Sequence, residues 1–331
     1  MANLGIPTYE DVKSAALRLK GHIKETPILR HDRLDEISGL KLFLKNETAQ
    51  KTGTFKYRGA FSRLSALNEA QKQQGVVAFS SGNHAQGVAL AAKELGISAI
   101  IVMPKTAPLK KKQGTRSHGA TIVEYDPKTQ VREEIAAQIG ARDNRIVVPA
   151  YDDAHVISGQ GSVGKEICEY FSALDTTLDA LITPVGGGGL CAGISLSMQA
   201  LSPKTKIYAA EPINYDDTYR SLQLGARVAN ANPPPTLCDA LMSPSPGEIT
   251  FSINQHSLSG VFRVTDQECL QAMAWVHELL GVTIEPGGSV ALAAALSGQT
   301  GIAQGSTIAI VLSGGNVDDD VMALALQTKR D

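Results

Sequence analysis

A single lysine follows a polar turn in the stretch KTGTFKYRGA at residues 51–60. An amphipathic run at 57–67 comes next, so Lys56 stands in the first turn of a predicted helix that Thr52 or Thr54 can cap. The positive end of the helix dipole and partial burial both disfavour an ammonium group and lower the pKa of such a lysine. A neutral amine can form a Schiff base or carry a proton, although a solvated lysine on a helix is an equally good interpretation of this stretch alone.

Four consecutive glycines lie between a predicted apolar strand and a predicted helix: Gly186, Gly187, Gly188 and Gly189. Their backbone N–H groups can close around a phosphate, and the helix N-terminus adds positive potential. The block lacks the Lys-Ser/Thr pair of a Walker loop, so ATP hydrolysis is not expected. The same glycines followed by Ala192, with Glu211 about 20 residues further on, also fit the dinucleotide-binding fingerprint, and this block alone favours neither interpretation.

Two further segments follow predicted strands: SSGNH at 80–84 and SGGN at 313–316. Ligands of parallel sheets bind at the carboxyl ends of the strands, so the polar groups of SSGNH are expected at such an edge. Without a ligand, one of Ser80, Ser81 and Asn83 would simply cap the next helix, and SGGN would be an ordinary turn. Both interpretations stay open from these residues alone.

Two acidic residues, Glu211 and Asp217, flank the short loop PINYD. Carboxylate oxygens are suitable ligands for Mg²⁺ or Ca²⁺, but two acids this close are also common on protein surfaces. His84 and His118 have no HExxH or CxxC companion. We therefore predict that the histidines are polar surface or capping residues.

The composition is that of an ordinary chain of 331 residues, long enough for two domains, with 43% hydrophobic and 19% charged residues. A net charge of −2 gives no electrostatic footprint for nucleic acid. No apolar run reaches the ~20 residues of a membrane span, and the N-terminus lacks the pattern of a secretory signal. Four widely spaced cysteines without a CxxC pair argue against a zinc site or a disulfide framework, and predict reduced thiols in a cytoplasmic protein.

Strands and helices alternate along most of the chain, which predicts parallel sheets with right-handed crossovers and helices on both faces. A long loop is expected at 230–249, where Pro, Ser and Gly are frequent. The predicted strands are 40–44, 76–80, 99–103, 121–125, 145–149, 180–185, 206–210, 261–264 and 306–312. The predicted helices are 8–19, 57–67, 84–95, one after Pro108, 131–139, 154–171, 190–201, 267–280 and 288–296.

The KTGTFKYRGA stretch resembles the cofactor-lysine motif of fold-type II pyridoxal phosphate (PLP) enzymes, and within them that of the threonine/serine dehydratase and serine racemase family. The SSGNH, GGGGL and SGGN blocks follow in the family's order and spacing, and the likeness covers nearly the whole chain. It implies an α/β fold of two open, twisted, mostly parallel sheets flanked by helices, as in the tryptophan synthase β-like fold. A smaller mobile domain, residues 52–151, is implied as an insertion in a larger cofactor-binding domain, residues 1–51 and 152–331.

The resemblance also implies a role for each matched residue. Lys56 would hold PLP and act as the base, and Ser81 would face it across the cofactor as the second acid–base group of racemases. Ser313 would lie at the pyridine nitrogen, where a neutral hydroxyl favours prompt loss of a β leaving group. The implied cofactor-binding residues are Phe55, Lys56, Asn83, Gly186, Gly187, Gly188, Gly189, Leu190 and Ser313. The implied substrate-binding residues are Ser80, Ser81, Asn83, His84 and Ser243.

A structural cation is implied as well, since family members bind Mg²⁺ (or Ca²⁺ or Mn²⁺) through the equivalents of Glu211, the Tyr215 carbonyl and Asp217. Two segments depart from the family pattern. The usual Ala-Asp-Gly is Cys-Asp-Ala here, and Ala240 adds a methyl group near the substrate. The racemase's substrate-binding arginine has no evident counterpart, with Gln138 near its place.

The resemblance therefore implies a PLP-dependent dehydratase, or ammonia-lyase, that converts a β-hydroxy-α-amino acid to a 2-oxo acid and ammonia. Serine and threonine are the default substrates, and the Ala240 segment leaves 3-hydroxyaspartate or a bulkier 3-hydroxy amino acid open. A racemase and a β-replacement synthase are alternatives within PLP chemistry. A nicotinamide-dependent dehydrogenase and a non-catalytic binding protein are alternatives outside it. A homodimer with a small amino acid as its ligand, and neither nucleic acid nor membrane as partner, is expected.

Overall fold

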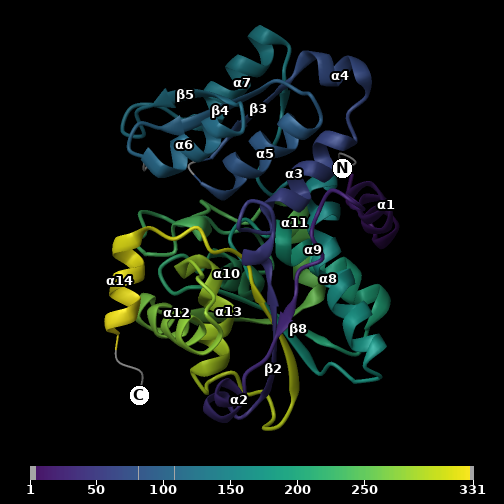
Figure 1. Ribbon diagram of the computed structural model, residues 1–331, viewed down its shortest axis with the longest axis vertical. Coiled ribbons are helices and arrows are strands. Elements are labelled where there is room, and N and C mark those ends of the chain that lie inside the picture. The colour runs from purple at the N-terminus through teal and green to yellow at the C-terminus, as the bar shows by residue number, and fades with distance from the viewer. Residues whose placement is uncertain (1–4, 81, 108, 329–331) are drawn as a thin grey trace.

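Two lobes, each with its own sheet, lie one above the other in the computed structural model, which describes residues 5–80, 82–107 and 109–328 (Figure 1). The larger sheet has the strand order β1 (Ile28–Leu29), β2 (Lys41–Asn46), β10 (Thr307–Leu312), β7 (Ala180–Pro184), β8 (Lys206–Pro212) and β9 (Leu258–Val264). The smaller sheet has the order β5 (Thr121–Tyr125), β4 (Ala99–Pro104), β3 (Val76–Phe79) and β6 (Ile146–Val147). All pairs are parallel except β1 with β2, so the predicted fold class is confirmed.

Both faces of the larger sheet are covered by helices. Alternate residues of β10 point to opposite faces, so Ile308 and Ile310 join one apolar core while Ala309 and Val311 join another. The first core packs on α12 (Asp266–Leu280) and α13 (Pro286–Leu296), and the second on α8 (Ala154–Ala173) and α9 (Gly189–Leu201). The other helices of this lobe are α1 (Tyr9–Leu19), α2 (Asp32–Ser38), α10 (Asp217–Leu224), α11 (Glu248–Ser257) and α14 (Asp319–Gln327).

The smaller sheet is built in the same way. Val76 and Ala78 of β3 face the core beneath α3 (Lys56–Ser65) and α5 (Asn83–Glu94), while Val77 faces α7 (Arg132–Asp143). This lobe also carries α4 (Glu69–Gln74) and α6 (Leu109–Ser117). All four strands of this sheet lie inside the predicted inserted domain, whose boundaries stay a prediction.

Several short elements differ from the sequence-based expectation. The long loop expected at 230–249 contains a 3₁₀ turn, η2 (Asp239–Leu241), and ends where α11 begins. The helices α2, α4, α10, α11 and α14 were not predicted, and the strand expected at 145–149 is reduced to the two residues of β6. Short helices stabilised by caps and by contacts with the rest of the fold give little periodic signal, as for α4, whose capping box is formed by Asn68 and Gln71.

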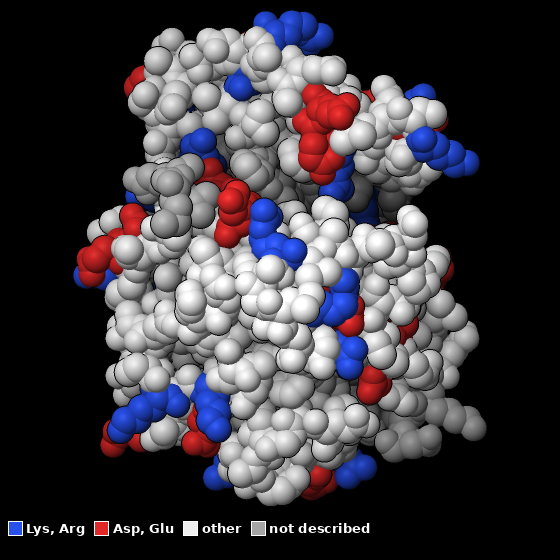
Figure 2. Space-filling view, turned by 180° about the vertical axis from the view of Figure 1, so that it is seen from behind, with Lys and Arg blue, Asp and Glu red and all other residues white. Residues whose placement is uncertain are grey.

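None of the helices within the described ranges combines the length and apolar character needed to cross a membrane. Seen from behind, Lys and Arg side chains are interspersed with Asp and Glu side chains over both lobes (Figure 2). This mixture agrees with the small net charge of −2.

Candidate active site

A cavity of about 510 Å³ lies between the two lobes. Its walls include segments that follow β3, β6, β7 and β10, so it sits at the carboxyl ends of parallel strands from both sheets. Ser81 lies outside the described residues. The other residues predicted to bind cofactor or substrate all line this cavity: Phe55, Lys56, Ser80, Asn83, His84, Gly186, Gly187, Gly188, Gly189, Leu190, Ser243 and Ser313.

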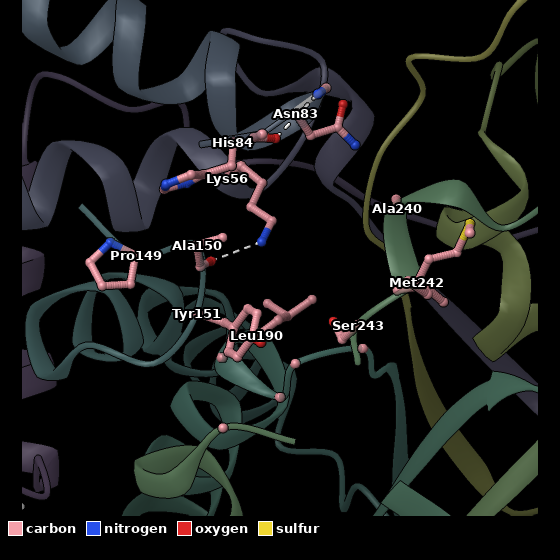
Figure 3. A pocket seen from close by; sticks show the side chains of 18 of the residues that line it. Lys56, Asn83, His84, Pro149, Ala150, Tyr151, Leu190, Ala240, Met242 and Ser243 are labelled. Carbon is pink, nitrogen blue, oxygen red and sulfur yellow. Dashed lines mark hydrogen bonds between the residues drawn. The ribbon is translucent and has the colours of Figure 1, made fainter. Parts of the chain in front are cut away.

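Lys56 is the first residue of α3, as predicted, and its side chain reaches into the cavity (Figure 3). The Thr54 hydroxyl accepts the backbone N–H of Lys56 at 3.2 Å, but the N-cap position is Phe55, whose side chain makes no capping hydrogen bond, so the predicted threonine cap is not formed. The ammonium nitrogen donates to the carbonyl oxygen of Ala150 at 2.9 Å. Burial lowers the pKa of Lys56 to about 8, and only the negative charge of Glu285 opposes this shift. A substantial fraction of this amine is therefore neutral near physiological pH.

A buried ion-pair network holds the helix that carries Lys56. Arg58, two residues further along α3, is fully buried and donates from Nε to Glu47 at 2.8 Å and from Nη2 to Glu166 at 2.9 Å. Lys45 also donates to Glu166, at 2.6 Å. Two buried cations thus face two carboxylates, and removing any one would leave a buried charge uncompensated. Since Glu47 and Glu166 belong to the larger lobe, this network fixes the start of α3 against that lobe.

The glycine block packs so closely against the fold that side chains there would collide with neighbouring residues. A Cβ on Gly187 would come within 2.3 Å of the Tyr151 ring. Gly188 has a φ of +95°, a backbone conformation that residues with a side chain rarely adopt. The carbonyl oxygen of the preceding residue, Gly187, accepts a hydrogen bond from the Thr250 hydroxyl at 2.7 Å. The helix α9 begins at Gly189, so its free N–H groups open at the cavity. A phosphate group fits this cradle by size, donors and helix polarity.

Asn83 connects the lobes through two hydrogen bonds. Its amide nitrogen donates to Glu285 at 2.6 Å, and its amide oxygen accepts from Asn316 at 2.8 Å. Glu285 is only 3% exposed, and burial, assisted by the charge of Asp239, raises the pKa of its carboxyl group to about 8. Glu285 therefore holds a proton more tightly than an exposed carboxyl group would, and it lies near the amine of Lys56. From the sequence, the segment 285–288 resembles a family segment near the substrate but could equally be a helix start. The burial of Glu285 depends on contacts with distant segments, so the sequence could not predict it.

His84 corrects one expectation, since it is neither a surface nor a capping residue. Its ring is buried, and its Nε2 lies 3.1 Å from the Val148 carbonyl oxygen. Burial, together with the nearby charge of Lys56, lowers the pKa of His84 to about 3. The ring is therefore neutral and donates from Nε2. Its position in the first turn of α5 points it inward, toward the smaller sheet.

Arg132 is a cavity residue for which the sequence predicted no role. The sequence gave no evident arginine in the smaller lobe for the substrate, yet Arg132 opens α7 and lines the cavity. Its guanidinium carbon lies 5.7 Å from the centre of the Phe79 ring, and Nε donates to Glu133 at 2.9 Å. Gln138 is exposed and does not line the cavity. The sequence feature that could have identified Arg132 is its position at the start of a helix soon after β5. The carboxyl end of β5 lies at the same edge of the sheet as the segment that follows β3.

Glu211 and Asp217 are buried side by side, away from the cavity. Glu211 accepts the N–H groups of Thr218 and Tyr219, which leaves it unsuited to grip a dinucleotide ribose. Burial raises the pKa of both carboxyl groups, that of Asp217 to about 6. Asp217 Oδ2 has no hydrogen-bond partner among the described residues, while Oδ1 accepts from Asn230 at 2.7 Å.

This acidic pair fits a divalent cation, which would supply the missing partner and neutralise the repulsion. Within the described ranges, no three His, Cys, Asp or Glu side chains gather as metal ligands. A cation here would therefore also take carbonyl or water oxygens. The carbonyl of Tyr215, in the loop between the two acids, stays the predicted third ligand.

Comparisons with known proteins agree with this geometry. Residues 19–314 match the family described as pyridoxal-phosphate dependent enzyme. The chain is 38% identical to an L-threo-3-hydroxyaspartate ammonia-lyase of Saccharomyces cerevisiae, over 98% of each chain. It is 41% identical to a serine racemase of Mus musculus, over 94% of this chain and 92% of the racemase. The structure of maize serine racemase superposes with a TM-score of 0.91 at 34% identity, over 97% of each chain. These likenesses exclude the dehydrogenase interpretation, and the chain belongs to the pyridoxal-phosphate dependent enzymes of fold type II.

Proposed function

We propose that this protein is a PLP-dependent ammonia-lyase whose preferred substrate is a 3-hydroxyaspartate. One observation carries the proposal: the Lys56 amine, with its lowered pKa, shares a cavity with the glycine cradle and with cationic side chains of the smaller lobe. Relatives similar over the full chain are named for elimination from L-threo-3-hydroxyaspartate. The products would be the corresponding 2-oxo acid and ammonia.

The chain's own groups divide the work. Bound PLP supplies the electron sink that makes the α-proton acidic. Lys56, as a neutral amine beside Glu285, accepts that proton. The N-terminal turn of α5 and the Ser80 hydroxyl hold the α-carboxylate, since both line the cavity at a positive helix end. The glycine cradle holds the phosphate, and Ser313, which lines the same cavity, serves the ring nitrogen.

The second carboxylate of a dicarboxylic substrate needs its own cation. Arg132 and Lys111 both line the cavity, and Lys111 is already paired with Asp239 at 2.9 Å. Among the described residues, the ion-pair partner of Arg132 is its exposed neighbour Glu133, bound through Nε in a contact of small energetic value, and the guanidinium group also lies over the Phe79 ring. A guanidinium group binds a carboxylate through two parallel hydrogen bonds. We therefore assign the distal carboxylate to Arg132.

A racemase activity is the second candidate, because the chain is about as similar to serine racemases as to the ammonia-lyases. Racemisation needs a second acid–base group on the far side of the cofactor, and the predicted group is Ser81. Exchange of the α-proton of D-serine into heavy water measures it directly. Exchange that disappears in Ser81→Ala would support the racemase, and no exchange in the parent protein would remove it.

Three further features belong to the same proposal. Glu211, Asp217 and the Tyr215 carbonyl bind Mg²⁺, or else Ca²⁺ or Mn²⁺. The protein is a homodimer, as its resemblance to this family implies. Its compartment is the cytoplasm, supported by four buried cysteines that are all free thiols.

A substrate panel tests the proposed activity. The purified holoenzyme is given L-threo- and L-erythro-3-hydroxyaspartate, L-serine and L-threonine, and the 2-oxo acid and ammonia are both measured. We expect kcat/KM for one 3-hydroxyaspartate isomer to exceed that for serine by roughly a hundredfold, the value of one buried bidentate pair. Equal or better use of serine would contradict the assignment. Faster consumption of O-acetylserine with sulfide would instead support β-replacement.

A further inference from the structure

A row of polar contacts joins the two lobes along one wall of the cavity. From the smaller lobe come Asn83, at the start of α5, and Lys111, on α6. Asn83 meets Glu285 and Asn316 as described above. Lys111 forms an ion pair with Asp239, in which Lys111 Nζ lies 2.9 Å from Asp239 Oδ2. The contacts of Asn83 are hydrogen bonds, so this ion pair is the charged contact of the row.

Lys111 reaches out of its own lobe. Its side chain is 12% exposed and lines the cavity, and its Nζ also lies 4.0 Å from Asp318 Oδ2. Its neighbour Lys112, 10% exposed, turns the other way and binds within the smaller lobe, to Glu124 at 3.0 Å and to the Lys105 carbonyl at 2.8 Å. These consecutive lysines have the same charge and similar burial, but Lys111 makes a contact between the lobes and Lys112 makes one within the smaller lobe.

Both partners of Lys111 belong to segments that shape the cavity. Asp239 begins η2, whose next residues, Ala240 and Leu241, line the cavity wall. Asp318 stands before α14, shortly after the SGGN turn that carries Ser313. Each contact therefore joins α6 to a cavity-forming loop of the larger lobe. The attraction of Asp239, with help from Asp318 and Glu285, outweighs burial and raises the pKa of Lys111, which stays charged.

We propose that Lys111 is a latch: its ion pair with Asp239 and Asp318 holds the smaller lobe closed over the cofactor and the substrate. Closure excludes water and brings the SSGNH segment of the smaller lobe against the glycine cradle of the larger one. Lys111 is a positioning residue, because it acts through the placement of the lobe and transfers no proton. The inference rests on the PLP site but not on which hydroxy amino acid is the substrate.

The test compares Lys111→Met with Lys112→Met in the holoenzyme. Hydroxylamine is added without substrate, and the rate at which it strips the cofactor is followed by absorbance. Lys111→Met is expected to react roughly three- to tenfold faster than the parent and to raise KM by a similar factor, with kcat changed less than about twofold. Lys112→Met loses an ion pair of the same kind and is expected to show lower thermal stability with the parental hydroxylamine rate.

Exchanging the two charges makes the test independent of folding defects. Lys111→Glu and Asp239→Lys should each open the cavity, and the double variant should return the hydroxylamine rate toward that of the parent. Hydrogen–deuterium exchange of the peptide 237–247 should be faster than in the parent in each single variant and should return toward the parental rate in the double variant. Equal hydroxylamine rates in Lys111→Met, Lys112→Met and the parent would overturn the proposal. So would a double exchange that reacts as fast as the faster single variant.

Discussion

The Lys56 ammonium nitrogen lies 2.9 Å from the carbonyl oxygen of Ala150, in the loop that leaves the smaller sheet (Figure 3). The next residue, Tyr151, packs its ring where a Cβ on Gly187 would stand. One short loop therefore contacts both the reactive amine and the phosphate cradle. This relationship ties the position of the lysine to the position of the glycines, although they are about 130 residues apart in the sequence.

The lowered pKa of Lys56 predicts how cofactor attachment depends on pH. Only the neutral amine adds to the PLP aldehyde, so the attachment rate of the apoenzyme should rise with pH, with a midpoint at about 8. The same shift affects stability. Between pH 8 and 10.5, approximately, Lys56 is protonated in the unfolded chain but not in the folded one, so its contribution increases the free energy of unfolding as pH rises. Stopped-flow absorbance measures the first effect, and a midpoint near 10.5 would contradict the buried environment.

Gly187→Ala should damage cofactor binding, because its new Cβ would stand 2.3 Å from the Tyr151 ring. Moving that ring would disturb the cradle at a cost of about 1–3 kcal/mol, or roughly a ten- to hundredfold weaker PLP affinity. Gly260→Ala is the matched control, since its Cβ would make an ordinary contact at 3.5 Å with Tyr208 on β8. Titration of apoenzyme with PLP measures both. Equal affinities in the two variants would show that Gly187 is not part of the cradle.

Arg132→Met should lower the preference for dicarboxylic substrates. Losing a charge-assisted, bidentate contact is expected to raise KM for 3-hydroxyaspartate by roughly ten- to hundredfold, while kcat/KM for serine changes little. Arg132→Lys should recover part of the loss, because it keeps the charge but not the two-pronged geometry. Steady-state kinetics on both substrates decides this. A parallel loss for serine and for 3-hydroxyaspartate would refute the specificity role.

The acidic pair predicts a metal-dependent stability. Mg²⁺ should raise the melting temperature of the chelator-treated protein by a few degrees, since the ion binds only the folded carboxylates. The effect should fade as pH falls through about 6, where Asp217 takes up a proton in competition with the ion. Asp217→Asn should abolish it. An identical melting temperature with chelator and with Mg²⁺ at neutral pH would argue against the site.

Much of this architecture follows from local patterns. Lys56 after its polar turn and the glycines after an apolar strand are readable because each motif needs particular residues at consecutive positions. The alternation of strands and helices likewise predicts parallel strand pairing, which the structure confirms for every pair of the two sheets except β1 with β2. The boundaries of long helices such as α8 and α12 fall within two residues of their expected positions, since both carry sustained apolar spacing.

Other features depend on contacts between distant segments. Arg132 was missed because only the packing of α7 on the smaller sheet brings it to the cavity. His84 was misjudged because its inward orientation is set by the tertiary fold around α5. Burial and the charge of Asp239, about 50 residues away in the sequence, raise the pKa of Glu285 against the opposing hydrogen bond from Asn83, about 200 residues away.

The most direct test of the central claim is borohydride reduction of the purified protein after incubation with PLP. The account predicts a visible absorbance band that reduction bleaches, with the mass of reduced cofactor found on the peptide that contains Lys56. Lys56→Ala should keep the far-ultraviolet circular dichroism of the parent and lose both the band and the turnover. The absence of any band, or a label on another lysine, would contradict the account.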